Sequence, residues 1–415
     1  MRNIKSVSIH VLTIIGLNLC YTLIIVKNYN YMGFELNFNT SKMIIISFIT
    51  FLLILYGETI KNTFLSMVWN VFFYLFYCGE SIYFQYASNN NWEILFGIIL
   101  FLVLLPIISN SKKRLITYQF KGDTLKGLFL ISCVLFVPVF LVYFRHINIR
   151  NLLFLDIYDT REVFRGVQTS IVGYLRAPLA MIILPISIVK SLEEKRYGYF
   201  SVSVFMIIFI FLAGAVKSIF IGLIAVLLFY FFSYRKKVFL FKISLFVLTW
   251  LSFISYYWKG NLFLIDVFIR RVIFVPAYLN DVFTSYFREN YTYYSHSPLG
   301  LGLVDYKYDQ SLSFFIGNEI IGREGLNANV GVLTEGYASF GVPGILFIVM
   351  LLLILFKYFD AIRFNSKFFG ILFIYIYYLN TSFLSILLLT HGLLFLIIVS
   401  YFYLSKKENN PLNTN

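Results

Sequence analysis

Several basic residues of this sequence stand within or beside long apolar runs, and they are its strongest candidates for chemistry. Arg176 lies inside the apolar stretch GYLRAPLAM, and Lys217 begins an apolar run after LAGAV. Arg270 and Arg271 come one turn before Pro276 in FLIDVFIRRVIFVPAYLNDVFTSYFREN. An ionisable group at membrane depth costs free energy, which makes such residues functional candidates. A guanidinium stays charged and offers a two-pronged donor, so the pattern favours binding of phosphate or diphosphate.

Seven basic residues are predicted to gather on the external side of the membrane and to bind the anionic headgroup of a lipid substrate. They are Arg161, Arg165, Arg176, Lys217, Arg270, Arg271 and Arg323. Four of them have simpler alternatives. Arg176 and Lys217 have side chains long enough to reach the membrane interface. Arg270 is spaced for an ion pair with Asp266 one turn earlier, and Arg271 also suits the surface of an interfacial helix.

A polar stretch, NANVGVLTEGYASFGVPGI at 327–345, precedes an apolar run and is predicted to form the rim and floor of an external site. Asn327 and Asn329 offer amide groups to sugar hydroxyls. The glycines of the stretch let the backbone approach a ligand closely. As an alternative, the glycines only make the backbone flexible and closely packed where the chain enters a packed helix.

Three residues are candidates for a general base that activates an acceptor hydroxyl: Glu324, Glu335 and His296. Each has another explanation. Glu335 is also placed to cap or pair near the entrance of a helix, and Glu324 is adjacent to Arg323. His296 lies in a loop rich in Ser and Tyr, where a hydrogen-bonded structural role is common. The arginines therefore carry more of the functional prediction than any single base.

Residues that bind a lipid headgroup belong in a membrane protein, and the composition agrees. The chain of 415 residues is 60% hydrophobic and 13% charged, with a mean hydropathy of +0.80. That is too apolar for a chain whose surface is in water. Runs long enough, or nearly so, to cross hydrocarbon predict about twelve transmembrane helices in an all-α polytopic membrane protein. They centre on 8–26, 43–57, 64–79, 93–110, 127–144, 171–190, 199–213, 216–232, 239–257, 343–357, 367–380 and 383–403.

Basic residues in the short connections predict that both termini are cytoplasmic, because Lys and Arg concentrate on the cytoplasmic side. The residues assigned to that side are Arg2, Lys5, Lys61, Lys112, Lys113, Arg114, Lys121, Lys126, Lys195, Arg196, Arg235, Lys236, Lys237, Arg363, Lys367, Lys406 and Lys407. This topology signal and attraction to anionic lipid account for the net charge of +14, so no nucleic-acid partner is implied.

The predicted organisation is a bundle of about nine helices over 1–257 with an external loop at about 145–170, a large external segment over 258–342, the last three helices over 343–403, and a cytoplasmic tail over 404–415. The external segment is too long for an idle connection. Its first part is predicted to form an amphipathic helix at the membrane surface, bent at Pro276. Three cysteines in apolar runs and four scattered histidines lack ligand spacing, so we predict no disulfide framework, metal or cofactor.

Two motifs in the external segment resemble the signature of the Wzy-type polymerases, which join oligosaccharide repeat units in O-antigen and capsule assembly. The first is R-x-x-x-x-P-A-x-x-N from Arg271, and the second is A-N-V-G-V-L-T-E-G-Y-A-S-F-G-V-P-G from Ala328. The many predicted spans and the large external loop before the last helices are also similar to the architecture of this family. A-G-A-V-K-S at 213–218 resembles the family's G-S-R-G-type helix start, with Lys217 where arginine is usual.

The resemblance implies a GT-C-like glycosyltransferase on the external face of a bacterial inner membrane. Its reaction would transfer a growing glycan from undecaprenyl diphosphate to the terminal sugar of a new lipid-linked repeat unit, without a metal and usually with inversion. Arginines aimed at the diphosphate would neutralise the leaving group. The implied partners are the lipid-linked oligosaccharide, membrane lipid, and a chain-length regulator and a flippase of the same pathway.

Two other functions remain open. A flippase for lipid-linked oligosaccharides has a similar number of spans, but such transporters commonly show two repeated halves, and we find no internal repeat. A ligase that moves the finished glycan to another acceptor would share the donor and the fold type. Functional charges confined to one side of the membrane favour an enzyme over a flippase, which must expose its site to both leaflets.

Overall fold

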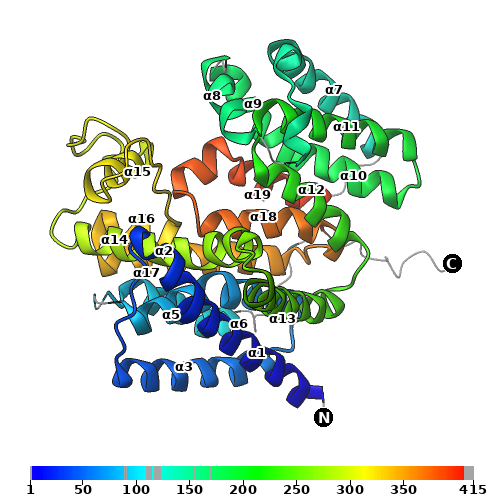
Figure 1. Cartoon of the computed structure of the whole chain (residues 1–415). Coiled ribbons are helices and arrows are strands. Elements are labelled where there is room, and N and C mark those ends of the chain that lie inside the picture. The colour runs from blue at the N-terminus through cyan, green and yellow to red at the C-terminus, as the bar shows by residue number, and fades with distance from the viewer. Residues whose placement is uncertain are drawn as a thin grey trace. The chain divides into compact units, whose positions relative to one another are not determined.

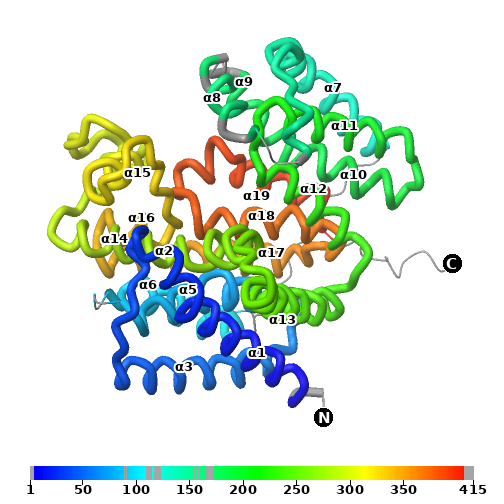
Figure 2. Tube along the Cα trace, viewed as in Figure 1, coloured from blue at the N-terminus to red at the C-terminus, as the bar shows by residue number. Residues whose placement is uncertain are grey.

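The computed structural model describes residues 2–87, 89, 91–108, 115, 123–153, 156–167 and 170–405. Every element in these ranges is helical, apart from one isolated antiparallel bridge between Phe364 and Ser405. The chain divides into two compact units, and each is assembled from separate parts of the sequence (Figures 1 and 2). Unit 1 comprises Met1–Lys112, Tyr234–Asp360 and Ile376–Ser385, and unit 2 comprises Lys113–Ser233, Ala361–Tyr375 and Ile386–Asn415.

Unit 1 holds the N-terminal helices and the segment 258–342. Its elements are α1 (Arg2–Leu19), η1 (Cys20–Ile25), α2 (Val26–Tyr29), η2 (Asn30–Met32), α3 (Thr40–Glu58), α4 (Thr63–Phe72), η3 (Phe73–Tyr77), α5 (Cys78–Tyr86), α6 (Glu93–Ile108), α13 (Tyr234–Lys259), η7 (Ile265–Phe274), α14 (Val275–Phe287), η8 (Pro298–Gly300), α15 (Leu312–Phe315), η9 (Ile316–Ile320), α16 (Val332–Phe340) and α17 (Val342–Ala361).

Unit 2 holds the middle of the chain and most of its C-terminal helices. Its elements are α7 (Thr124–Tyr143), η4 (Phe144–His146), η5 (Ile149–Leu153), α8 (Ile157–Val167), α9 (Ser170–Pro178), η6 (Leu179–Ile183), α10 (Leu184–Glu193), α11 (Tyr197–Gly214), α12 (Lys217–Tyr230), η10 (Ser366–Phe368), η11 (Ile386–Thr390) and α19 (Leu393–Tyr403). Helix α18 (Phe369–Leu379) belongs to unit 2 as far as Tyr375.

Within the described ranges, seven helical segments have the length and composition to cross a membrane. They are Ile4–Met32, Thr40–Glu58, Thr124–His146, Val172–Glu193, Tyr197–Gly214, Tyr234–Lys259 and Val342–Ala361. Four shorter apolar helices overlap other predicted runs: Glu93–Ile108, Lys217–Tyr230, Ser366–Leu379 and Leu393–Tyr403. The predicted run 64–79 falls in the helices from α4 to α5. For the described residues, an all-helical fold with several helices of membrane-spanning length is thus confirmed, while the number twelve stays a prediction.

The last predicted span, 383–403, is not one continuous helix. The π-helix η11 ends at Thr390, and α19 begins at Leu393. Gly392 lies between them with φ +79°, a left-handed conformation that glycine adopts without strain. The run was predicted as one helix because its composition is apolar throughout. His391 and Gly392, at the break, lower its hydropathy too little to indicate an interruption.

Apolar and aromatic packing and close helix contacts hold much of unit 1 together. Helix α1 packs along α13, where Trp250 Nε1 donates to the carbonyl of Leu12 at 3.2 Å. Gly79 of α5 lies so close to η7 that a Cβ there would collide with the carbonyl oxygen of Ile273. Cys20 and Cys78 are buried, and both are free thiols. These two cysteines therefore act as packing residues.

The segment 258–342 is a folded part of unit 1. The bend predicted at Pro276 coincides with the change from the π-helix η7 to α14, where a proline cannot donate a backbone hydrogen bond. Helix α14 is buried along one side rather than merely resting on a surface. Its apolar residues join a core made by Leu279, Phe283, Phe287, Leu312, Ile316, Ala328, Val330, Ala338 and Phe383.

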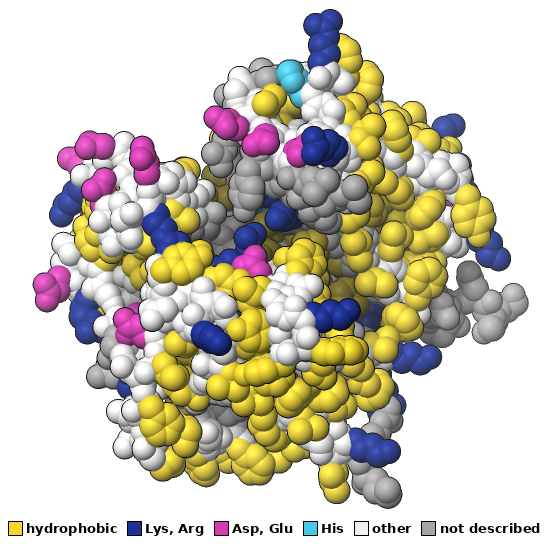
Figure 3. Space-filling model, viewed as in Figure 1, with side chains coloured by type: hydrophobic (Ala, Val, Ile, Leu, Met, Phe, Trp, Pro, Cys, Tyr) yellow, Lys and Arg dark blue, Asp and Glu magenta, His cyan; other side chains and the backbone are white. Residues whose placement is uncertain are grey.

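The surface of unit 1 changes character from one end to the other. Figure 3 shows acidic side chains over the region that contains α15, and exposed acidic residues there are Asp305, Asp309, Glu319 and Glu324. Figure 1 places α3 at the other end of the unit. Helix α3 exposes a continuous set of large apolar side chains: Ile44, Ile45, Phe48, Phe51, Leu52 and Leu55. A surface of this kind is expected to face lipid.

We expect Gly344→Ala to destabilise unit 1, because a Cβ at Gly344 would collide with the carbonyl oxygen of Gly336 where α17 meets α16. The cost of such overpacking is about 1–3 kcal/mol of unfolding free energy. Thermal unfolding in detergent measures it. The control is Gly127→Ala in α7, where a Cβ meets nothing within 4 Å and helix propensity favours alanine. Equal stability of the two variants would contradict the prediction.

Candidate functional site

Two arginines of η7 share one carboxylate. Arg270 Nε donates to Asp266 Oδ1 at 2.8 Å, and Arg271 Nε lies 3.0 Å from Asp266 Oδ2. The pairing of Arg270 with Asp266 is the alternative that the spacing had left open. The Arg270 side chain is only 7% exposed, whereas that of Arg271 is 44% exposed. One carboxylate cannot neutralise two guanidinium groups, so the pair keeps a net positive charge, and Arg271 presents it to solvent.

A third arginine joins these two through the short segment 29–32. The Arg270 guanidinium lies 4.5 Å from the centroid of the Tyr29 ring, and its Nη1 lies 3.2 Å from the sulfur of Met32. Arg323 Nη2 donates to the carbonyl of Tyr31 at 2.7 Å. We call Arg270, Arg271 and Arg323 the arginine cluster. Aromatic faces and a backbone carbonyl hold Arg270 and Arg323, and these contacts add no negative charge to the cluster.

His296 and Glu335, predicted as separate candidates for a base, form one buried pair. His296 Nε2 lies 3.2 Å from Glu335 Oε1, and their side chains are 3% and 0% exposed. Thr292 Oγ1 lies 3.2 Å from the other ring nitrogen, Nδ1. The second carboxylate oxygen of Glu335 accepts the backbone N–H of Leu384. Glu335 is therefore placed to fix the orientation of the imidazole, which is how a carboxylate supports a histidine base.

A second buried polar chain runs beside this pair. Asn280 Nδ2 donates to Glu80 Oε2 at 2.9 Å, and Thr334 Oγ1 donates to Asn280 Oδ1 at 2.6 Å. These bonds join α5, α14 and α16. Asn280 is the last residue of the motif that begins at Arg271, so the sequence marked its position without indicating its partners. Thr334 precedes Glu335, and the chain therefore helps to fix the start of α16.

The remaining predicted residues of unit 1 lie on its surface. Asn327, Asn329 and Glu324 are exposed, and the Asn329 N–H donates to the carbonyl of Asn327 at 3.0 Å. The glycines of this stretch approach protein backbone. A Cβ on Gly331 would lie 2.5 Å from the carbonyl oxygen of Leu379. Close helix packing, the alternative explanation for these glycines, accounts for this contact.

Unit 2 gathers three of the predicted basic residues around the turn between α11 and α12. Arg161 Nε donates to the carbonyl of Ala215 at 3.1 Å. The Arg176 guanidinium lies 4.5 Å from the centroid of the Phe164 ring and next to Gly214. Lys217 is the first residue of α12. The side chain of Arg165 lies outside the described residues. The predicted basic residues thus form two groups, one within each unit.

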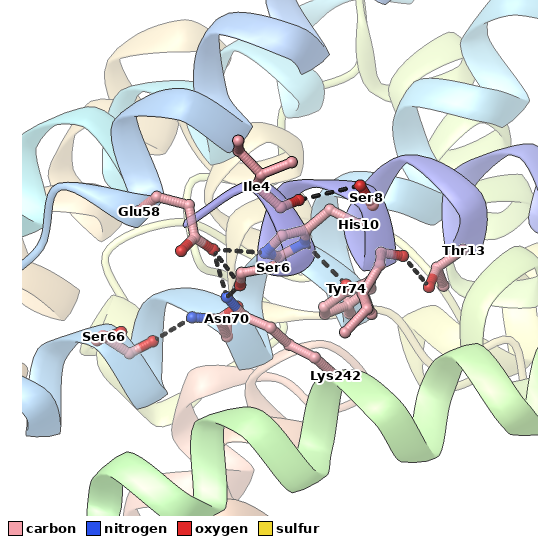
Figure 4. Close-up of polar contacts among 11 residues, drawn as sticks. Ile4, Ser6, Ser8, His10, Thr13, Glu58, Ser66, Asn70, Tyr74 and Lys242 are labelled. Atoms are coloured by element: carbon pink, nitrogen blue, oxygen red, sulfur yellow. Dashed lines mark hydrogen bonds and ion pairs between the residues drawn. The ribbon is translucent and has the colours of Figure 1, made fainter. Parts of the chain in front are cut away.

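The sequence analysis did not predict a buried ionic network between the helices of unit 1 (Figure 4). Lys242 Nζ of α13 lies 2.6 Å from Glu58 Oε1 of α3, and His10 Nε2 of α1 lies 3.3 Å from the same oxygen. Ser6 Oγ donates to that oxygen at 2.7 Å, and the Tyr74 hydroxyl lies 2.8 Å from His10 Nδ1. Ionisable residues in apolar runs, the signal used for Arg176, also mark this network.

We expect Lys242→Met to lower the free energy of unfolding by up to about 3–5 kcal/mol, because it leaves Glu58 without its ammonium partner. The double variant Lys242→Met with Glu58→Gln removes both charges and is expected to recover at least half of the loss. Unfolding in mixed detergent micelles measures both. A double variant no more stable than the single one would show that the two charges are not coupled.

Comparisons of the chain with protein-family models, with curated proteins and with solved structures find no match.

Proposed function

We propose that this chain is a membrane glycosyltransferase that polymerises undecaprenyl-diphosphate-linked oligosaccharide repeat units. In this proposal it is a GT-C-like protein of about twelve spans in a bacterial cytoplasmic membrane, with its termini in the cytoplasm and its site on the external side. The product would be an O-antigen or capsular polysaccharide. The observation that carries the proposal is the arginine cluster within the motif-bearing segment 258–342.

The chemistry of the arginine cluster supports a diphosphate ligand. Arg270 and Arg271 share one carboxylate, Asp266, and Arg323 donates to the backbone carbonyl of Tyr31, so the cluster retains positive charge for an anion. Arg271 is the most available of the pair on η7, and its planar fork suits two phosphate oxygens. In glycosyl transfer from a polyprenyl diphosphate, negative charge develops on the diphosphate as the bond to the anomeric carbon breaks. Guanidinium groups held in place by the protein stabilise that charge without having to reorganise.

In this proposal, the pair of His296 and Glu335 activates the acceptor hydroxyl. The acceptor hydroxyl attacks the anomeric carbon, and its proton passes to His296, whose orientation Glu335 fixes. Attack opposite the leaving diphosphate inverts the anomeric centre. Because the side chains of both residues are buried, a bound acceptor must displace part of the loop that carries His296 to reach the imidazole.

A lipid substrate also needs room for its hydrocarbon chain, and unit 1 offers a crevice. A cavity of about 470 Å³ lies between α1, α3 and α5 and is lined by residues that include Ile14, Phe51, Ile54, Ile82 and Tyr86. Its apolar lining suits an isoprenoid chain, and Asn18 and Gln85 add polar groups. The crevice borders α3, whose outer surface is apolar.

Purified protein in liposomes, supplied with undecaprenyl-diphosphate-linked repeat units, tests the proposal. We expect a ladder of glycans on a gel. Repeat units whose acceptor hydroxyl is methylated should give no ladder, which separates polymerisation from hydrolysis. Labelled lipid that crosses the bilayer without forming a ladder would indicate a flippase instead. Transfer of a single unit to an added acceptor, again without a ladder, would indicate a ligase.

A further inference from the structure

Unit 1 contains a polar pocket that none of the predicted site residues lines. Its volume is about 450 Å³, which is within the range of small-molecule sites. The pocket lies between α14, the chain that follows η2, the end of α5 and the end of η9. Residues that give it its chemistry are Gly33, Glu35, Tyr83, Tyr278, Asp281 and Tyr286.

Two carboxylates and three phenol rings define the chemistry of this pocket. Asp281 is largely buried, and its oxygens accept amide hydrogens from Asn89 at 2.9 Å and Asn91 at 2.7 Å. Burial raises the pKa of Asp281, and these amide hydrogen bonds oppose the rise. Glu35 is exposed, and its carboxylate accepts a hydrogen bond from Asn37 at 3.1 Å. Both carboxylates therefore keep acceptor capacity for a ligand that brings several donors.

A glycine shapes part of the pocket wall. Gly33 has φ +93°, and a Cβ there would lie 2.5 Å from the Tyr278 ring. The ring therefore packs against the backbone at Gly33, and it also lines the pocket. Tyr83 and Tyr286 add further aromatic surface. Carboxylate acceptors next to aromatic faces suit a sugar, because its hydroxyls donate hydrogen bonds and its C–H faces pack on the rings.

The charges around the pocket select against an anionic sugar. Among the described residues that line it, there is no lysine or arginine. Lys42 and Arg323 lie outside this lining: Lys42 Nζ donates to the carbonyls of Ala87 and Asn89, and Arg323 Nη2 donates to that of Tyr31. The charges in the lining itself are the carboxylates of Glu35 and Asp281. Exposed acidic residues of the α15 region add negative charge on the same unit. A uronic acid or phosphorylated sugar would meet repulsion there, whereas an amino sugar would gain attraction.

The pocket is connected by sequence to the arginine cluster. Residues 29–32 hold Arg270 and Arg323, and the next residues, Gly33 and Glu35, line the pocket. A diphosphate at the cluster and a sugar in the pocket would thus contact one continuous segment. We propose that this pocket binds a neutral or amino sugar of the lipid-linked oligosaccharide and rejects acidic sugars. The carrier lipid in this statement rests on the proposed function, whereas the sugar class rests on the pocket.

Saturation-transfer NMR tests the inference on the full chain in lipid nanodiscs, which avoid sugar-based detergents. The probes are the methyl glycosides of glucosamine, glucose and glucuronic acid. We expect signals from the first two and a much weaker signal from the glucuronide. Glu35→Gln and Asp281→Asn should each weaken glucosaminide binding about tenfold, as expected for the loss of a charged hydrogen-bond acceptor.

Matched variants keep the result interpretable. Glu35→Gln changes an exposed residue, so it tests the pocket even if Asp281→Asn fails to fold. Asp305→Asn removes an exposed carboxylate outside the pocket and should leave binding unchanged. Absence of signal from all three glycosides, equal binding of the glucuronide, or unchanged binding by Glu35→Gln would overturn the inference.

The same measurement is independent of the polymerase proposal. A methyl glycoside carries no diphosphate, so Arg271→Ala should bind it as the wild type does. Sugar binding without a glycan ladder from any lipid-linked substrate would overturn the proposed reaction while leaving the pocket assigned. A glycan ladder without sugar binding would overturn the pocket assignment while leaving the proposed reaction in place.

Discussion

Arg271→Ala is expected to reduce glycan ladder formation by about 10²–10³, the effect of removing one donor that stabilises transition-state charge. The fold should survive, because Asp266 keeps its ion pair with Arg270 and the Arg271 side chain is nearly half exposed. The measurement is the initial rate of ladder formation in liposomes, with circular dichroism and size-exclusion profiles to confirm folding.

Two comparison variants separate charge from geometry at this position. Arg271→Lys keeps the charge but loses the planar fork, so an intermediate rate is expected. Lys307→Ala removes an exposed cation elsewhere in the segment 258–342 and should leave the rate unchanged. If Arg271→Ala polymerised as fast as the wild type, the arginine cluster would not be the diphosphate site.

Glu335→Gln is expected to lower the polymerisation rate by about 10²–10⁴, the range for loss of acid–base assistance. Glutamine retains an oxygen for the Leu384 N–H, so most of the local structure should remain, but the negative charge beside His296 is lost. The rate and the thermal unfolding temperature are measured together. A large loss of rate at unchanged stability supports a role in orienting the base.

The other candidate carboxylate gives the contrasting case. Glu324 is exposed, whereas the side chains of His296 and Glu335 are buried. We expect Glu324→Gln to retain most of the activity. If Glu324→Gln were inactive and Glu335→Gln fully active, the assignment of the base would have to be exchanged between these two residues.

Short-range spacing predicted some of the site contacts correctly. Asp266 was a candidate partner for Arg270 because the two residues are one helical turn apart. That Asp266 also pairs with Arg271 was not predicted, because the π-helix η7 changes which side chains face each other. The contacts of Arg270 and Arg323 with residues 29–32 bridge more than 200 positions of sequence, and no local pattern reports them.

The same limit applies to the pair of His296 and Glu335. Each was found as a candidate by its residue type, but they lie 39 residues apart, and only the packing of α16 brings them together. Apolar run lengths predicted the membrane-length helices well, because length and hydrophobicity are local properties. The break at Gly392 and the network of Lys242, Glu58 and His10 depend on backbone conformation and on distant partners, so the runs alone did not reveal them.

The interleaved composition of unit 1 has a consequence for how the protein is made. Lys242 follows Glu58 by 184 residues. At about 5–20 residues per second, the ribosome needs roughly 10–40 s to synthesise that interval. During this time Glu58 is present without the ammonium group that it meets in the finished protein. The first helices of unit 1 are thus expected to wait at the insertion machinery until α13 emerges, so the order in which helices are released into lipid differs from the order of synthesis.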